Sequence, residues 1–230
     1  MKKLLYFLFA MFVVVGLNAC SPDDDPTNNP PVENPDTPDN PDQPENPDPE
    51  NPDNPDNPDE PSGTKTLIVY YSFTNNVHTI VNDLRTQIEA DVVRVEPSEE
   101  GLDYAANGYA IGSALISAIR ANPNDASSYP GIKNTIDNLA DYDRIIVAAP
   151  LWHSQMAAPL QTFLFTYGGQ MAGKRIGLIV SSSSSGISGV EADARRLIPD
   201  GNFLTPSLWI RSSQTSNCHS MIAGWLNEIN

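Results

Sequence analysis

The sequence is poor in the residues that build disulfide frameworks and metal sites. It has two cysteines and three histidines among 230 residues. Cys20 lies in an N-terminal leader motif, so Cys218 has no partner for a disulfide, and Cys218 with its neighbour His219 lacks a third group for nucleophilic catalysis. The remaining histidines, His78 and His153, show no metal-ligand spacing. We therefore predict no metal site and a structural role for Cys218.

Basic residues are also scarce, which argues against nucleic-acid binding. The chain has 13 Lys and Arg against 29 Asp and Glu, a net charge of −16, and no basic stripe. Residues 21–62 hold 14 of the acidic residues and 14 of the 21 prolines but no base, and Asn-Pro-Asp recurs there. Such a segment cannot bury enough surface to offset the entropy of ordering it. We predict a disordered, extended linker over 21–62.

A hydrophobic run long enough to span a membrane is missing too. Leu4–Val15 follows two lysines and is too short for a good spanning helix. It leads into Leu-Asn-Ala-Cys at 17–20, which resembles the lipobox of a bacterial lipoprotein, and Ser21–Asp25 is similar to the acidic tags of some Bacteroidetes surface lipoproteins. The resemblance implies a signal peptide over 1–20, lipidation of Cys20, and an outer membrane lipoprotein on the periplasmic or cell-surface face. A signal anchor or a simple secretory signal is the alternative.

Residues 63–230 predict one α/β domain. Apolar runs at 67–71, 145–152 and 175–180 indicate buried strands, with a half-exposed strand at 91–97 and a short one at 206–210. Amphipathic helices alternate with them. This alternation predicts a doubly wound parallel sheet with helices on both faces.

Three of these strands end in polar or aromatic loops, at Ser72–Asn76, Pro150–His153 and Ser181–Gly186. In doubly wound sheets ligands bind at the carboxyl ends of the strands, where these loops can meet. The first loop precedes a helix whose unpaired N–H groups suit a phosphate, although its Ser, Thr and Asn side chains could simply cap the helix. The second loop offers the indole of Trp152, and the third a row of hydroxyls. The set suits a flat aromatic ligand that carries a phosphate.

The same loops resemble those of flavodoxins. Tyr71–Val77 is similar to the phosphate loop Ser-x-Thr-Gly-Asn-Thr, and Pro150–His153 with the following Met156 and Pro159 resembles a Pro-x-Trp-Trp…Met-Pro pattern of one flavodoxin subgroup. The resemblance covers nearly all of 64–230. It implies a flavodoxin-like, doubly wound sheet of five parallel strands in the order 2-1-3-4-5, and FMN as the cofactor. The implied FMN-binding residues are Ser72, Thr74, Asn75, Asn76, Val77, Pro150, Leu151, Trp152, His153, Ser182, Ser183, Ser184 and Gly186.

The sequence departs from the flavodoxin pattern at several of these positions. Asn75 replaces the glycine of the phosphate loop, and asparagine tolerates left-handed backbone better than most residues. Val77 replaces a threonine and so removes one hydroxyl from the phosphate shell. Ser183 and Ser184 replace glycines, and a serine would be strained there if the loop required positive φ.

Two functions of different class follow from these residues. The first is an FMN-binding electron-transfer protein tethered to the bacterial envelope by its lipid, with no catalytic side chains and an unknown redox partner; an electron carrier is favoured over a substrate-specific oxidoreductase. The second is a flavin-free envelope protein that binds another small molecule or a protein partner. An α/β hydrolase is disfavoured because the chain has no Gly-x-Ser-x-Gly elbow.

Overall fold

The computed structural model describes residues 63–230. The predicted signal peptide, the lipidation site Cys20 and the predicted linker all lie outside the described residues. Within 63–230, no helix is both long enough and apolar enough to cross a membrane.

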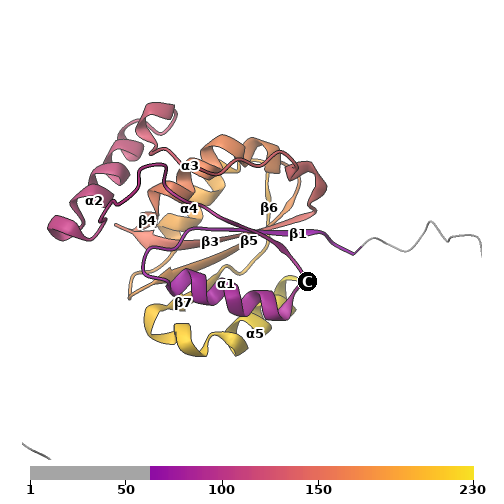
Figure 1. The fold of residues 1–230 in the computed structure, drawn as a ribbon. Coiled ribbons are helices and arrows are strands. Elements are labelled where there is room, and N and C mark those ends of the chain that lie inside the picture. Colours follow the sequence, from indigo (N-terminus) through magenta and orange to yellow (C-terminus); the bar gives the residue numbers. More distant parts are fainter. Residues whose placement is uncertain (1–62) are drawn as a thin grey trace, which may run out of the picture. The chain divides into compact units, whose positions relative to one another are not determined.

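A parallel sheet forms the centre of the domain. β1 (Thr66–Tyr70) lies between β2 (Asp91–Arg94) and β3 (Arg144–Trp152), and β5 (Arg175–Ser182) follows β3 on the other side. Each of these pairs is parallel, so all four strands end at the same edge. The doubly wound flavodoxin-like sheet expected from the sequence is thereby confirmed (Figure 1).

The fifth position of the sheet is shared by two short strands, where the sequence predicts a single strand at 206–210. β6 (Asn202–Phe203) pairs with the start of β5, and β7 (Leu208–Arg211) pairs with its end, both in parallel. Pro206 lies between them and has no N–H to donate to a ladder. The ladder is therefore interrupted at this point.

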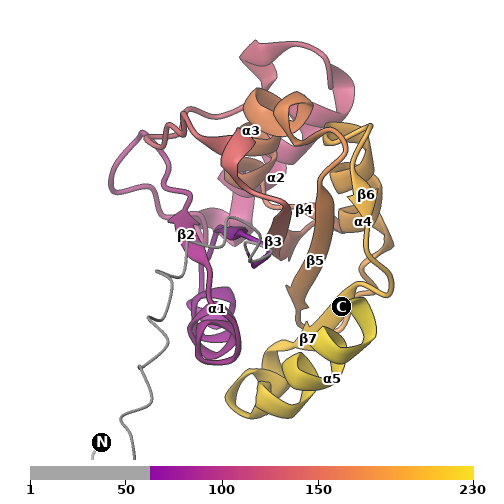
Figure 2. The ribbon, with the colours of Figure 1, turned by 90° about the vertical axis from the view of Figure 1, so that its right-hand side faces the viewer.

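Helices cover both faces of the sheet (Figures 1 and 2). On one face lie α1 (Asn76–Gln87) and α5 (His219–Ile229), and on the other lie α2 (Ala106–Ala121), α3 (Ala158–Tyr167) and α4 (Ser188–Leu197). The remaining elements are the short strand β4 (Gln155–Met156), antiparallel to β3, and four 3-10 turns at Ala126–Ser128, Leu139–Asp141, Gly168–Met171 and Ser212–Asn217.

The sheet separates two hydrophobic cores, and this explains the unbroken apolar runs of the sequence. Along β1, Leu67 and Val69 belong to the core beneath α2, α3 and α4, whereas Ile68 and Tyr70 belong to the core beneath α1 and α5. All four are almost fully buried. A strand covered on both faces has no solvent side on which to place polar residues.

Substitutions of Gly177 and Gly224 are expected to change the stability of the fold in opposite directions. A Cβ at Gly177 in β5 would lie 3.0 Å from the Trp225 ring, which is held by its own hydrogen bond to the Pro206 carbonyl, whereas a Cβ at the exposed Gly224 in α5 would contact nothing. We expect Gly177→Val to lower the free energy of unfolding by about 1–3 kcal/mol. Gly224→Ala should raise it by about 0.5–1 kcal/mol. Urea unfolding followed by circular dichroism measures both, and equal effects of the two variants would contradict the packing described for Trp225.

Candidate functional site

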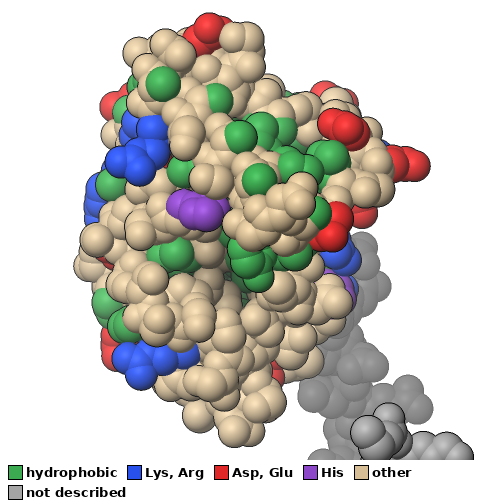
Figure 3. All heavy atoms as spheres, turned by 90° about the vertical axis from the view of Figure 1, so that its left-hand side faces the viewer, with side chains coloured by type: hydrophobic (Ala, Val, Ile, Leu, Met, Phe, Trp, Pro, Cys, Tyr) green, Lys and Arg blue, Asp and Glu red, His purple; other side chains and the backbone are tan. Residues whose placement is uncertain are grey.

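The three predicted loops meet in one pocket at the carboxyl edge of the sheet. The cavity measures about 310 Å³, near the lower end of the range of about 300–1,000 Å³ for small-molecule sites. Figure 3 views this edge of the molecule, where hydrophobic side chains gather around a hollow and charged side chains lie toward the periphery. The lining consists of Ser72, Phe73, Thr74, Asn76, Val77, Tyr104, Tyr109, Gly112, Pro150, Leu151, Trp152, His153, Ser181, Ser182, Ser183 and Ser212.

The lining combines hydroxyls and amides with aromatic and aliphatic side chains, and it is almost free of charge. It contains no Lys, Arg, Asp or Glu, and His153 is its only titratable group other than the two tyrosines. Hydroxyls, backbone amides and aromatic rings therefore supply the chemistry of this pocket. The arrangement favours binding and stacking over acid–base catalysis.

At one end of the pocket, the turn after β1 presents the N-terminus of α1. The Ser72 hydroxyl accepts a hydrogen bond from the His78 N–H at 3.1 Å, and the Asn75 carbonyl accepts one from the Thr79 N–H at 2.9 Å. Asn75 itself has φ 64° and ψ −4°, the left-handed conformation expected for a residue in place of glycine, and its side chain makes no capping hydrogen bond.

The first N–H groups of α1 are thus left available. Asn76 and Val77 begin the helix, where N–H groups have no intrahelical acceptor. In the described part of the chain, the Asn75 side chain makes no capping bond, Ser72 bonds only the third N–H, that of His78, and both Asn76 and Val77 line the pocket. The positive end of the helix dipole points to the same place. An anion can therefore bind here without displacing a protein contact.

At the other end of the pocket, Trp152 lies in a cluster of aromatic rings. Its ring centroid is 4.9 Å from that of Tyr104, and Tyr71 and Phe73 make edge contacts with it at 5.6 and 6.0 Å. Gly112 in α2 approaches the indole so closely that a Cβ there would lie 3.4 Å from it. These contacts fix the plane of the indole at the pocket wall.

Trp152 and the exposed His153 are presented by a tight hairpin between β3 and β4. Trp152 pairs with Gln155, so His153 and Ser154 are the two loop residues, and their φ angles are 47° and 66°. A two-residue hairpin of this type normally uses Asn-Gly because both positions require positive φ. The sequence predicts a loop at Pro150–His153 but does not reveal this strain.

The serine loop after β5 is held by hydrogen bonds of its first residues. The Ser182 hydroxyl donates to the Ser185 carbonyl at 2.8 Å and accepts from the Trp209 indole N–H at 2.9 Å. Ser183 and Ser184 do not have positive φ. The serines in place of glycines are therefore compatible with the backbone of this loop.

The pocket includes most of the residues that the sequence suggests, with some differences. Asn75, Ser184 and Gly186 are not part of the lining. Conversely, the lining includes residues that are absent from the predicted set: Phe73, Tyr104, Tyr109, Gly112, Ser181 and Ser212. For Tyr104, an aromatic residue within the mostly polar segment 98–108 was an available signal, because a polar loop seldom needs one. Nothing near Ser212, which follows β7, marks it in the sequence.

Tyr104 and Tyr109 have features expected of ligand contacts. The Tyr104 side chain is buried, and its hydroxyl is one of two buried side-chain groups in 63–230 without a hydrogen-bond partner. Burial, and then the Glu99 carboxylate, raise the pKa of this hydroxyl, so it stays protonated and able to donate at neutral pH. Tyr109 is 53% exposed and is the one large hydrophobic side chain exposed among the described residues.

Other candidate residues have structural partners instead. His78 bonds to the Tyr70 hydroxyl at 2.7 Å and to Asn82 at 3.1 Å, and it does not line the pocket. His219 lies 3.1 Å from the Asp83 carboxylate. The Cys218 thiol is buried, and burial raises its pKa, which disfavours the reactive thiolate.

Comparison with known proteins agrees with this fold. The flavodoxin family profile matches residues 65–229. The chain belongs to the flavodoxin family. Among solved structures, this flavodoxin is similar to a protein from Bacteroides eggerthii described as a flavoprotein (20% identity, 72% of this chain and 98% of that chain, TM-score 0.56). It is also similar to a flavoprotein from Lactobacillus acidophilus in complex with FMN (20%, 68% and 99%, 0.53) and to one from Bacteroides uniformis described as a flavoprotein (21%, 70% and 99%, 0.54). At these identities the likeness shows the shared fold.

The left-handed backbone at residue 75 predicts a difference between two small substitutions. We expect Asn75→Ala to lower the free energy of unfolding by about 1 kcal/mol, because alanine tolerates this conformation less well than asparagine. Asn75→Gly should leave the stability close to that of the unmodified protein. Chemical unfolding of both variants tests this, and a stability of Asn75→Ala equal to that of Asn75→Gly would exclude positive φ at this residue.

Proposed function

We propose that this flavodoxin binds FMN in the pocket between β1, β3 and β5 and acts in electron transfer. The observation that carries the proposal is the pairing, in one uncharged pocket, of a helix N-terminus whose first two N–H groups have no acceptor with a fixed indole. These are a site for a phosphate and a site for a flat ring. Membership of the flavodoxin family and the FMN complex of the Lactobacillus acidophilus flavoprotein support the choice of FMN.

The residues at the α1 end suit the phosphate. The N–H groups of Asn76 and Val77 are free to donate, and Thr74 adds an exposed hydroxyl beside them. Ser72 uses its oxygen to accept the His78 N–H, which leaves its hydrogen free to donate. Val77 contributes through its backbone, so the loss of a hydroxyl relative to the flavodoxin pattern removes only one donor of several.

The residues at the other end suit the isoalloxazine ring. Trp152 provides a held aromatic wall, and the exposed ring of Tyr109 lies at the same pocket. The unpartnered Tyr104 hydroxyl can donate to a polar ring atom. Such a contact would satisfy the only buried side-chain group of the lining that lacks a partner in the described structure.

The bound flavin would supply the redox chemistry, and the chain would bind, orient and partly desolvate it. The lining has no carboxylate, lysine or arginine to transfer a proton to a substrate. We therefore favour an electron carrier over an enzyme that acts on a specific substrate. The redox partner would meet the flavin at the open side of the pocket.

Titration with FMN and with riboflavin tests the cofactor and its phosphate site together. The full-length protein, purified in detergent, should quench FMN fluorescence and bind FMN at least about tenfold more tightly than riboflavin, because charge-assisted hydrogen bonds contribute about 1.5–3 kcal/mol each. Failure to bind either flavin would favour the flavin-free alternative, in which the same pocket takes another small molecule.

Two variants test the phosphate end and the ring end of the pocket separately in this titration. Thr74→Val should weaken FMN binding by up to about tenfold and leave riboflavin binding unchanged, because valine keeps the shape and removes the hydroxyl. Trp152→Ala should weaken both flavins by about 2- to 10-fold through loss of stacking. The reverse pattern would place the phosphate and the ring at other ends of the cavity.

We also propose that the domain is carried by an outer membrane lipoprotein anchor at Cys20. The support is the lipobox-like sequence at 17–20 behind an apolar run and the proline- and acid-rich segment that follows. An envelope location would place the flavin where exported or membrane-bound redox partners can reach it.

Lipidation is tested by growing the host with labelled palmitate. The protein should take up label and fractionate with membranes, and Cys20→Ala should abolish both. Cys218→Ala is the matched control: its thiol is buried, so its loss should leave the label unchanged. Equal labelling of the Cys20→Ala protein would rule out this anchor.

A further inference from the structure

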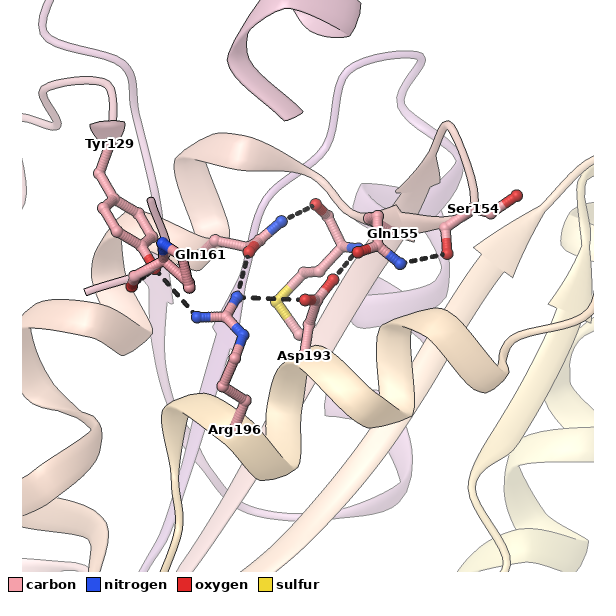
Figure 4. Close-up of polar contacts among 8 residues, drawn as sticks. Tyr129, Ser154, Gln155, Gln161, Asp193 and Arg196 are labelled. Carbon is pink, nitrogen blue, oxygen red and sulfur yellow. Dashed lines mark hydrogen bonds and ion pairs between the residues drawn. The ribbon is translucent and has the colours of Figure 1, made fainter. Parts of the chain in front are cut away.

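A polar cluster on α3 and α4, with two buried members and an arginine at the surface, holds the hairpin that presents Trp152 and His153. We call Gln161, Asp193 and Arg196 the Arg196 cluster. The Met156 N–H donates to the Asp193 carboxylate at 2.9 Å, and the Met156 carbonyl accepts from the Gln161 amide at 2.7 Å. Both backbone groups of one β4 residue are therefore held by side chains from helices (Figure 4).

Arg196 connects the two side chains that hold Met156. Its guanidinium donates to the Gln161 amide oxygen at 2.8 Å and to the other Asp193 oxygen at 3.1 Å, and it also bonds to the Tyr129 hydroxyl at 3.0 Å. Gln161 and Asp193 are 1% and 5% exposed. Polar groups buried this deeply require partners, and each has them here only while Arg196 and Met156 stay in place.

The hairpin that the cluster holds is under backbone strain. The pocket residues Leu151 and Trp152 pair with Met156 and Gln155, respectively. A shift of Met156 therefore moves both Leu151 and Trp152. The loop residues His153 and Ser154 both have positive φ, a conformation that is unfavourable at non-glycine positions. Such a conformation persists only where the surrounding structure determines it.

α4 also restricts the loop from outside. A Cβ at Gly189 would lie 1.8 Å from the Ser154 carbonyl oxygen, so the helix and the loop are in direct contact. The loop thus has α4 on its outer side and the pocket on its inner side. Both the cluster and this contact come from helices that contribute no residue to the pocket lining.

We propose that Gln161, Asp193 and Arg196 are positioning residues for the flavin site: they hold the strained Trp152–Gln155 hairpin in the conformation that binds the ring. This inference rests on the proposed FMN binding. It assigns to α3 and α4 the task of setting the geometry, and thereby the potential, of the bound flavin. None of the three residues contacts the pocket.

Asp193→Asn is the sharpest variant. Asparagine has the shape of aspartate but only one acceptor oxygen. Whichever way its amide is turned, an NH₂ group must face either the Met156 N–H or the Arg196 guanidinium. One bond of the cluster is replaced by a donor–donor contact, while the packing volume stays the same.

The experiment compares four full-length proteins: unmodified, Asp193→Asn, Asp193→Asn with Ser154→Gly, and Tyr129→Phe. We expect Asp193→Asn to weaken FMN binding by about tenfold, to shift the midpoint potential of the bound flavin, and to speed hydrogen exchange in a peptide spanning 151–157. Ser154→Gly removes strain from the loop and should restore much of the affinity and the potential. Tyr129→Phe removes a partner of Arg196 but neither bond to Met156, so it should keep the unmodified affinity.

The outcomes distinguish positioning from general stability. The proposal is overturned if Asp193→Asn lowers the melting temperature while affinity and potential stay unchanged, or if Ser154→Gly restores neither. If the unmodified protein binds no FMN, the proposed function fails, and the hydrogen-exchange rates decide the role of the cluster. Faster exchange at 151–157 in Asp193→Asn but not in Tyr129→Phe supports that role. Equal rates in all four proteins overturn it.

Discussion

The parallel pairing of β3 with β1 and with β5 is the constraint on which the pocket depends. Tyr70 is in register with Ala148, and Pro150 is in register with Ser181. The three strands therefore release their loops at nearly the same level. Because both faces of these strands are buried in hydrophobic cores, the points at which the loops leave the sheet are set by packing beneath the site. An uncharged pocket can then form from short polar side chains beside a group of aromatic rings.

Unfavourable backbone conformations are concentrated where the loops face the pocket. Asn75 begins the helix at one end, and His153 and Ser154 turn the hairpin at the other, all with positive φ. Each conformation is stabilised by neighbouring groups: Ser72 and Thr79 hold the first turn, and α4 with its buried aspartate holds the second. Packing and hydrogen bonds thus hold a few backbone groups in conformations from which they would otherwise relax.

The sequence predicted those parts of the structure that follow from periodicity and local chemistry. Continuous apolar runs identified β1, β3 and β5, and the short polar residues that follow them identified the loops. The left-handed turn at Asn75 was also within reach, because few other residues tolerate it. The division of the last strand at Pro206 and the two-residue β4 were too short to leave a periodic pattern.

Other parts depend on tertiary docking, which local patterns do not encode. Tyr104 and Ser212 enter the pocket from segments more than a hundred residues apart, and neither has a distinctive neighbourhood in sequence. Likewise, Asp193 and Arg196 form an ordinary i, i+3 pair on a helix. Only the position of Gln161 on α3 and of Met156 on β4 turns that pair into a network that holds the hairpin.

The absence of fixed charge in the pocket has an electrostatic consequence. No lysine or arginine lines it, so a phosphate bound at the start of α1 would keep most of its negative charge, offset only by dipoles. The potential at this edge of the molecule would then be more negative in the loaded form than in the empty form. A cationic protein surface that approaches the edge could tell the two forms apart at long range, before any contact with the ring is made.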